Sequence, residues 1–523
     1  MLPRALAKID GSPHKGNKSK WTDKLQARYN DPDSTPFMSA PEWIPEVAII
    51  DAMFAINTNP LRQHKTLEQY AYLLFRQFVI PHYQHGTNEV HLVFHHPGRV
   101  DFNPKDCEHK RRYGQAKSTA KEHNHITFTP QSAIPRPWRE YLECKQCKRS
   151  LVEALGLVYL RTASHHLREG QILVLAGCFS GEAQDDGWVI TGGCSVPEPT
   201  QAYRSNAQEA DMRVWRHATQ TEGKRILIYS PDTDVYNIGL TLVQPTCQYV
   251  VQINLPQNTP RYIDLNKLLL CFQCDPDLAS LPQDQLGSIL LQLYIVTGCD
   301  YVSYVSGIGK ATFLNCFFQH AEFITGTQSK GYLSQTNISN MNTVFLLFVR
   351  LMGTAYFKSN LATLVSKLGF ETPNQLYNSI NPSLSDEEKH REWYLSIKRE
   401  IRILHEDQRP PTITSLWRHW MRSCWIKDMW TNSPKPDLYQ GLAHPESQGW
   451  LKRDSGYTID WEDDKVLQQI QATLDFLDKG CTCKTGCRTK RCGCPKNGRS
   501  CGAGCECRGC TNLQVLRQKW CFL

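Results

Sequence analysis

Residues 225–240 read RILIYSPDTDVYNIGL, an apolar run that leads directly into a turn with two aspartates. Similar apolar runs come earlier: VAII at 47–50, VHLVF at 90–94 and QILVLAGCF at 171–179. Nearly continuous hydrophobicity is typical of strands buried on both faces, and strands separated by helical stretches favour a parallel sheet. The sequence therefore predicts an α/β fold in which helices flank a parallel sheet.

Acidic residues lie near the expected ends of these strands and of a long apolar helix. They are Asp51, Glu209, Asp211, Asp232, Asp234 and Asp300. Ligands of parallel α/β sheets bind beyond the carboxyl ends of the strands. Carboxylates that meet there repel one another unless cations neutralise them, and hard oxygen ligands suit Mg²⁺ or Mn²⁺. Two such ions about 4 Å apart are an arrangement that cleaves phosphodiesters, so we expect these acids to hold two divalent ions.

Each acid also has an ordinary structural explanation. Asp232 and Asp234 suit a turn and a helix N-cap, and Asp300 suits the end of a helix. Glu209 and Asp211 suit the first turn of a helix, where the helix dipole favours negative charge. Their joint order along the chain is the stronger argument for a shared site.

That order resembles the PIN-like flap endonuclease (5′ nuclease) superfamily over about residues 45–325. The resemblance rests on four segments: IIDAMFAI (49–56), QEADMRVWRHA (208–218), SPDTDVYNI (230–238) and TGCDYVSYVSGIGKATFL (297–314). It implies that the six acids are catalytic metal ligands. It also implies a helix–two-turn–helix whose residues Gly307, Gly309 and Lys310 bind a DNA phosphate through backbone N–H groups and lysine charge.

The segment VHLVFHHPGR (90–99) departs from this pattern, because His95 stands where the superfamily usually carries an aspartate. Histidine is a poorer ligand for Mg²⁺ than for Mn²⁺ or Zn²⁺, so the site could be retuned or inactive. A basic run follows it, and relatives place phosphate-binding side chains there. The run contains Lys105, Lys110, Arg111 and Arg112; a solvated helix face is the alternative explanation.

Nine of the 21 cysteines lie in CTCKTGCRTKRCGCPKNGRSCGAGCECRGC, residues 481–510. Cysteines in C-x-C pairs are poor disulfide partners but good chelators. Three Zn²⁺ need twelve sulfur contacts, so nine cysteines suffice if three of them bridge two ions. The predicted zinc ligands are Cys481, Cys483, Cys487, Cys492, Cys494, Cys501, Cys505, Cys507 and Cys510.

This cysteine segment resembles the CXC domain of the tesmin/TSO1 family, although two of its inner spacings are shifted. The resemblance implies that residues 481–513 bind DNA. A zinc module that only stabilises the fold is the alternative. A nuclease-like domain followed by a CXC module also resembles proteins derived from mobile elements of animal genomes, that is, a transposon-derived architecture.

The bulk composition fits a globular chain, with 41% hydrophobic residues and a net charge of +8 that mildly favours anionic partners. There is no run of eighteen apolar residues and no signal-peptide segment, so we expect no membrane association and reduced cysteines. The predicted organisation is a mobile polar tail (1–40), a nuclease domain (41–325), a helical extension (326–432), a linker with a short helix (433–480) and the zinc module (481–513).

We therefore expect a divalent-metal-dependent DNA nuclease of the nucleus. Its substrate would be DNA, with branched and single-stranded forms included, rather than a small molecule. The alternative is a catalytically impaired DNA-binding or chromatin-associated protein that keeps the nuclease fold as a scaffold.

Overall fold

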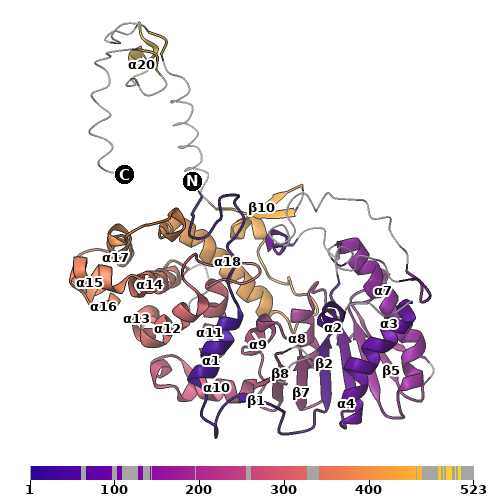
Figure 1. The fold of residues 1–523 in the computed structure, drawn as a ribbon. Helices are drawn as coiled ribbons and strands as arrows, with labels where there is room; N and C mark the ends of the chain where they lie inside the picture. Colours follow the sequence, from indigo (N-terminus) through magenta and orange to yellow (C-terminus); the bar gives the residue numbers. More distant parts are fainter. Residues whose placement is uncertain are drawn as a thin grey trace. The chain divides into compact units, whose positions relative to one another are not determined.

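The structure is a computed structural model of the 523-residue chain. The residues it describes are 2–59, 66–96, 103–108, 128–133, 142, 144–194, 196–254, 261–326, 341–454, 456–461, 481–483, 487, 491–496, 501 and 505–507. The chain divides into two compact units, residues 4–459 and residues 460–523 with the first three residues. The larger unit contains the sheet and all but one of the described helices (Figure 1).

A nine-stranded sheet forms the centre of the larger unit, in the order β1-β9-β8-β7-β2-β3-β4-β5-β6. The strands are β1 (Phe37–Met38), β2 (Val47–Asp51), β3 (Glu89–Val93), β4 (Ile172–Ala176), β5 (Gly187–Thr191), β6 (Glu198–Thr200), β7 (Arg225–Tyr229), β8 (Gln248–Gln252) and β9 (Tyr262–Asp264). The five central strands, from β8 to β4, pair in parallel, and the outer strands pair antiparallel. The prediction of an α/β fold with parallel strands at the four apolar runs is confirmed.

The chain reverses its direction across the sheet between β2 and β7. From β2 it adds β3 and then β4 on one side, and it returns to place β7 and then β8 on the other side of β2. Such a switch point leaves a crevice beyond the carboxyl ends of the two strands, because their connections leave in opposite directions. β2 ends at Asp51, and Asp232 follows β7 closely.

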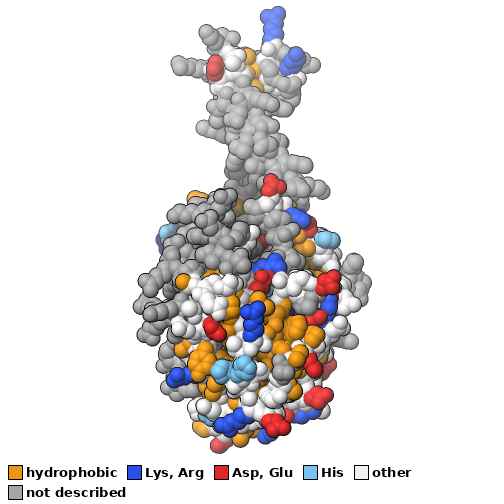
Figure 2. Space-filling view, turned by 90° about the vertical axis from the view of Figure 1, so that its right-hand side faces the viewer, with side chains coloured by type: hydrophobic (Ala, Val, Ile, Leu, Met, Phe, Trp, Pro, Cys, Tyr) orange, Lys and Arg blue, Asp and Glu red, His pale blue; other side chains and the backbone are white. Residues whose placement is uncertain are grey.

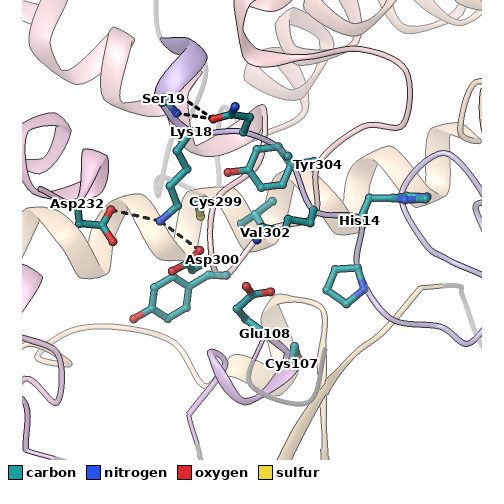
Figure 3. Close-up of a pocket in the computed structure, with 15 residues that line it drawn as sticks. His14, Lys18, Ser19, Cys107, Glu108, Asp232, Cys299, Asp300, Val302 and Tyr304 are labelled. Atoms are coloured by element: carbon teal, nitrogen blue, oxygen red, sulfur yellow. Dashed lines mark hydrogen bonds and ion pairs between the residues drawn. The ribbon is translucent and has the colours of Figure 1, made fainter. Parts of the chain in front are cut away.

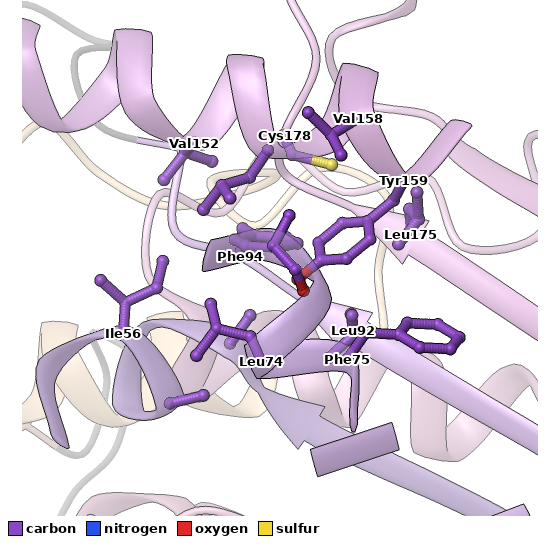
Figure 4. Close-up of a cluster of buried hydrophobic side chains, with 14 of the residues drawn as sticks. Ile56, Leu74, Phe75, Leu92, Phe94, Val152, Val158, Tyr159, Leu175 and Cys178 are labelled. Atoms are coloured by element: carbon purple, nitrogen blue, oxygen red, sulfur yellow. The ribbon is translucent and has the colours of Figure 1, made fainter. Parts of the chain in front are cut away.

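Side chains of the central strands alternate between two covered faces. On one face, Val90 and Leu92 of β3 belong to an apolar cluster. It includes α2 (Ala52–Thr58), α3 (Leu67–Leu74), the π-helical turn η1 (Phe75–Val79) and α7 (Lys145–Thr162), as Figure 4 shows for Leu74, Leu92 and Tyr159. On the other face, His91 contacts His217 of α8 (Ala210–Gln220). Helices therefore bury both faces, as the continuous hydrophobicity of the strands requires.

Most of the remaining helices lie on the side of the sheet away from β5 (Figure 1). They are α9 (Thr233–Gly239), α10 (Leu265–Cys274), α11 (Leu286–Val296), α12 (Lys310–Gln319), α13 (Ala321–Thr325), α14 (Met341–Ser359), α15 (Leu361–Leu368), α16 (Pro373–Ser379), α17 (Asp386–Glu400) and α18 (Ile413–Thr431). The imidazole of His419 in α18 hydrogen-bonds to the carbonyl of Val296 in α11 at 2.8 Å. The predicted helical extension is therefore continuous with the sheet domain. The compact unit of residues 4–459 has no boundary at residue 325, where we expected one.

The N-terminal residues are packed, which corrects the expectation of a mobile polar tail over residues 1–40. Helix α1 (Ser19–Arg28) buries Trp21 and Leu25 completely, and β1 pairs with β9. The preceding residues run beside the loop before α12, where Ser306 N–H donates to the carbonyl of Ala5 at 2.7 Å. A few apolar side chains in a polar segment are enough to dock it.

Residues 433–459 are also more ordered than the linker that was expected. They contain a hairpin of β10 (Trp450–Arg453) and β11 (Gly456–Ile459), and Trp450 of this hairpin is fully buried. The short helix expected near 463–479 lies outside the described residues. No helix in the described part of the chain is long and apolar enough to cross a membrane.

One face of the larger unit, seen in Figure 2, carries hydrophobic side chains interspersed with charges of both signs. The exposed large hydrophobic residues of the chain include Tyr72 of α3 and Leu157 of α7.

Candidate functional site

The carboxyl ends of β2 and β7 place two aspartates at the switch point of the sheet. Asp51 is the last residue of β2 and caps α2, because its Oδ1 accepts from the N–H groups of Met53 and Phe54. Asp232 caps α9 by accepting from the N–H of Asp234 at 2.9 Å. The capping explanation and the shared-site explanation are therefore both compatible with these residues.

Helix α8 begins at the same edge of the sheet and supplies Glu209 and Asp211, which are both buried. Two groups of side chains have ligand atoms within 4.8 Å of one another. The first is Asp51, His95 and Asp211, and the second is Asp211, Asp232 and Asp234. Four of the six predicted acids and His95 thus converge in arrangements that could hold metal ions.

The other two predicted acids are paired with lysines. Glu209 Oε2 lies 2.9 Å from Lys105 Nζ and 3.2 Å from His95 Nδ1. Asp300, which follows α11, lies between two ammonium groups, 3.1 Å from that of Lys18 and 3.8 Å from that of Lys105. Among the described residues, neither Glu209 nor Asp300 belongs to a group with metal-ligand spacing.

The electrostatics of the acidic site leave the carboxylates incompletely neutralised. Burial raises the pKa of Asp51 to about 6, although hydrogen bonds from the α2 N–H groups oppose the shift. Burial and the negative charge of Asp232 raise the pKa of Asp211 well above its usual range. Burial also raises the pKa of Asp234 to about 6, in spite of Lys18. A divalent cation would favour the ionised form of all three.

His95 faces the acids from the end of β3. Burial lowers the pKa of its imidazole to about 4, more than the neighbouring Glu209 raises it. The side chain is therefore neutral at physiological pH, which is the form that ligates metals. An imidazole beside two carboxylates fits Mn²⁺ or Zn²⁺ better than Mg²⁺.

Lys18 is the residue of this site that the sequence did not reveal. Its ammonium contacts Asp234 Oδ2 at 2.6 Å and Asp232 Oδ1 at 3.4 Å, in addition to Asp300. Burial alone would lower the pKa of Lys18, but these three carboxylates hold it well above its usual value. Nothing in the surrounding NKSK distinguishes this lysine from a solvated one. Lys105 was expected to bind phosphate, and it instead lies buried against Glu209.

A pocket of about 500 Å³ opens beside these residues. Its wall includes His14, Lys15 and Lys18 of the N-terminal segment, together with Asp232 and Asp300 (Figure 3). Cavities of this size hold small molecules, and they can also hold one end of a longer polymer.

The loop expected to bind DNA phosphate has a different construction from the prediction. Gly307 and Gly309 are exposed, and Gly307 has a φ of 74°, which favours glycine. Lys310 is buried, and its Nζ donates to the carbonyl of Tyr294 and to Thr297 Oγ1. The binding of a DNA phosphate by Lys310 stays a prediction, although its ammonium points into the protein. The predicted phosphate-binding residues Lys110, Arg111 and Arg112 lie outside the described residues.

The smaller unit contains the cysteine cluster. Eight of the nine predicted ligands are described, and Cys510 lies outside the described residues. Two groups of four sulfurs have metal-ligand spacing: Cys481, Cys487, Cys492 and Cys501, and Cys481, Cys494, Cys501 and Cys505.

The sulfur separations fit a tetrahedral metal. The Sγ atoms of Cys481 and Cys487 are 3.6 Å apart, and those of Cys494 and Cys505 are 3.7 Å apart. Four sulfurs about 2.3 Å from one zinc ion lie about 3.8 Å from each other in a tetrahedron. Cys481 and Cys501 belong to both groups, which agrees with bridging ligands.

The fold and these two sites define an α/β protein with an acidic centre at the switch point of its sheet and a cysteine cluster that could bind zinc. No protein-family model matches the chain, and no curated protein matches it significantly. The assignment of a function therefore depends on the geometry and on the sequence motifs.

Proposed function

We propose that the chain is a divalent-metal-dependent nuclease that hydrolyses phosphodiester bonds in DNA, as expected of a PIN-like flap endonuclease domain. The observation that carries this proposal is the convergence of Asp51, His95, Asp211, Asp232 and Asp234 at the switch point of the sheet. A divalent ion bound there would polarise a phosphate oxygen and lower the pKa of water.

The protein's own residues would prepare the site for this chemistry. Asp51, His95 and Asp211 would hold the ion, and the buried surroundings strengthen their attraction for it. The pocket beside Lys18 would admit a phosphodiester, with the lysine ammonium attracting a phosphate oxygen. The low pKa of His95 keeps its imidazole available as a ligand instead of a proton donor.

The cysteine cluster would hold three Zn²⁺ with nine thiolates and would act as a CXC module that contacts DNA. The positively charged side chains between its cysteines support this role, and the net charge of +8 agrees with an anionic partner. A DNA substrate would place the chain in the nucleus.

The proposal is tested by cleavage of branched, single-stranded and duplex DNA by the full chain with Mg²⁺ or Mn²⁺. We expect Asp211→Asn to lower cleavage by about 100-fold or more, because Asp211 belongs to both ligand groups. Asp264→Asn is the matched control, since Asp264 is a similarly buried aspartate that belongs to neither ligand group; it caps α10 through the N–H of Lys267. Equal cleavage by the two variants would refute the assignment of Asp211 as a metal ligand. Faster cleavage of RNA than of DNA would make RNA the substrate.

A second candidate is a catalytically impaired DNA-binding protein that uses the fold as a scaffold. Its supporting observation is His95, an imidazole within the ligand group where the superfamily carries an aspartate. Replacement of His95 by aspartate should distinguish the two functions. A gain of about tenfold or more in Mg²⁺-dependent cleavage would favour the impaired site, and a loss would favour a native site adapted to His95.

A further inference from the structure

Three carboxylates surround the ammonium of Lys18 at the side of the acidic centre nearest the pocket. Figure 3 shows the side chain between Asp232 and Asp300, and the third carboxylate is that of Asp234, at 2.6 Å. Only 18% of the Lys18 side chain is exposed. A cation with three carboxylate partners fulfils the charge-balancing role that a metal ion would otherwise fulfil.

Both oxygens of Asp234 are engaged by protein donors. Oδ2 contacts Lys18, and Oδ1 accepts from the hydroxyl of Tyr294 at 2.5 Å. In the second ligand group, Asp234 therefore already forms an ion pair with an ammonium and accepts a hydrogen bond from a hydroxyl. By contrast, within the described part of the chain neither Asp51 nor Asp211 forms an ion pair, although the charge of Lys105 acts on Asp211 from farther away.

The position of Lys18 is fixed by the helix that follows it. Trp21 of α1 packs edge-on against Tyr294 with ring centroids 5.3 Å apart, and Thr22 Oγ1 hydrogen-bonds to the hydroxyl of Tyr236 at 2.8 Å. At the other end of α1, Arg28 forms two hydrogen bonds of 2.5 Å with Asp275. Lys18 is thus held at the acids by a docked helix and is not a freely moving surface side chain.

We propose that Lys18 takes the place of a second divalent ion, so that the acidic centre binds one divalent cation at Asp51, His95 and Asp211 beside a tethered ammonium. The inference rests on the metal site of the proposed function, and it would replace the expectation of two Mg²⁺ or Mn²⁺ ions by one. It makes Lys18 the group that contacts the phosphodiester from the Asp232 and Asp234 side. Because the lysine carries one charge where a metal carries two, it neutralises the three carboxylates less completely than a second ion would.

Counting bound Mn²⁺ tests the proposal without requiring cleavage. The full chain, loaded first with zinc at its cysteines, is titrated with Mn²⁺ while electron paramagnetic resonance measures the free ion. We expect one tight Mn²⁺ per chain for the native protein and for Lys18→Arg, and two for Lys18→Met. Lys15→Met is the matched control, because Lys15 lines the same pocket and is exposed; it should bind one.

The outcomes separate this inference from the proposed function. Two tight ions in the native chain, or one in Lys18→Met that melts at the native temperature, would overturn the role of Lys18 and leave the metal site intact. No tight ion in the native chain would overturn the metal site and the inference with it. If Lys18→Met fails to fold, Lys18→Gln and the count for the native chain still decide the question.

Discussion

The hydroxyl of Tyr294 donates a hydrogen bond of 2.5 Å to Oδ1 of Asp234, and both side chains are almost completely buried. Tyr294 belongs to α11 and Asp234 to α9, so this bond joins the helical region to the acidic edge of the sheet. It supplies a donor to a carboxylate that burial would otherwise leave poorly solvated.

Removal of this donor should destabilise the fold. We expect Tyr294→Phe to lower the free energy of unfolding by about 1–3 kcal/mol, measured by urea denaturation at neutral pH, because a buried acceptor loses its partner. Tyr356→Phe is the control, since the buried hydroxyl of Tyr356 has no hydrogen-bond partner among the described residues. Similar losses in the two variants would show that the bond to Asp234 contributes little.

Helix α1 should depend on Arg28. Its guanidinium makes two hydrogen bonds to Asp275 and one of 2.6 Å to Asp277. We expect Arg28→Met to cost about 1–3 kcal/mol of unfolding free energy. Arg409→Met removes a comparable fork to Glu406, but that pair is exposed, so its loss should cost about 0.5 kcal/mol or less. A larger effect at Arg409 would contradict this ranking.

The buried Lys310 should make stability depend on pH. Burial lowers the pKa of Lys310 to about 7, so from pH 7 upward the unfolded chain binds a proton that the folded chain lacks. The stability of the native protein relative to Lys310→Met should therefore rise between pH 7 and 9, by about 1–3 kcal/mol. Lys24→Met, at an exposed lysine of α1, should show no such trend. A flat difference for Lys310 would mean that it is charged when buried.

Removal of zinc should affect the cysteine cluster alone. We expect a strong chelator to release about three ions per chain and to leave the main calorimetric transition of residues 4–459 unchanged. Cys481→Ser should reduce the bound zinc, because Cys481 belongs to both groups of sulfurs. Cys194→Ser should not, since this exposed cysteine lies outside the cluster. Equal zinc content in both variants would contradict the assignment of ligands.

The sequence predicted the features that depend on local patterns. The parallel strands were identifiable because β2, β3, β4 and β7 are almost continuously hydrophobic, and the acids near their ends could be located by position. Contacts between distant segments were not identifiable. Lys18 and Trp21 lie in a polar stretch whose composition resembles that of a tail, and their partners are more than 200 residues away.

The motifs also did not show which lysine side chains are buried. GIGK has the glycines of a phosphate-binding loop, yet the side chain of Lys310 turns inward to Tyr294, which the four letters do not indicate. Likewise, Lys105 begins a basic run and still lies buried, because Glu209 compensates its charge. Only the three-dimensional neighbours distinguish such lysines from solvated ones.

The docking of the N-terminal segment bears on how the protein should be produced. A recombinant fragment that started at residue 41 would expose the aromatic surface of Tyr294 and Phe272 that Trp21 and Tyr29 cover. Such a fragment would be prone to aggregate during purification. It would also delete residues 13–19 of the pocket wall. Inactivity of that fragment would thus reflect the loss of the N-terminal segment. For the same reason, an affinity tag is better separated from Ala5 and Leu6 by a spacer.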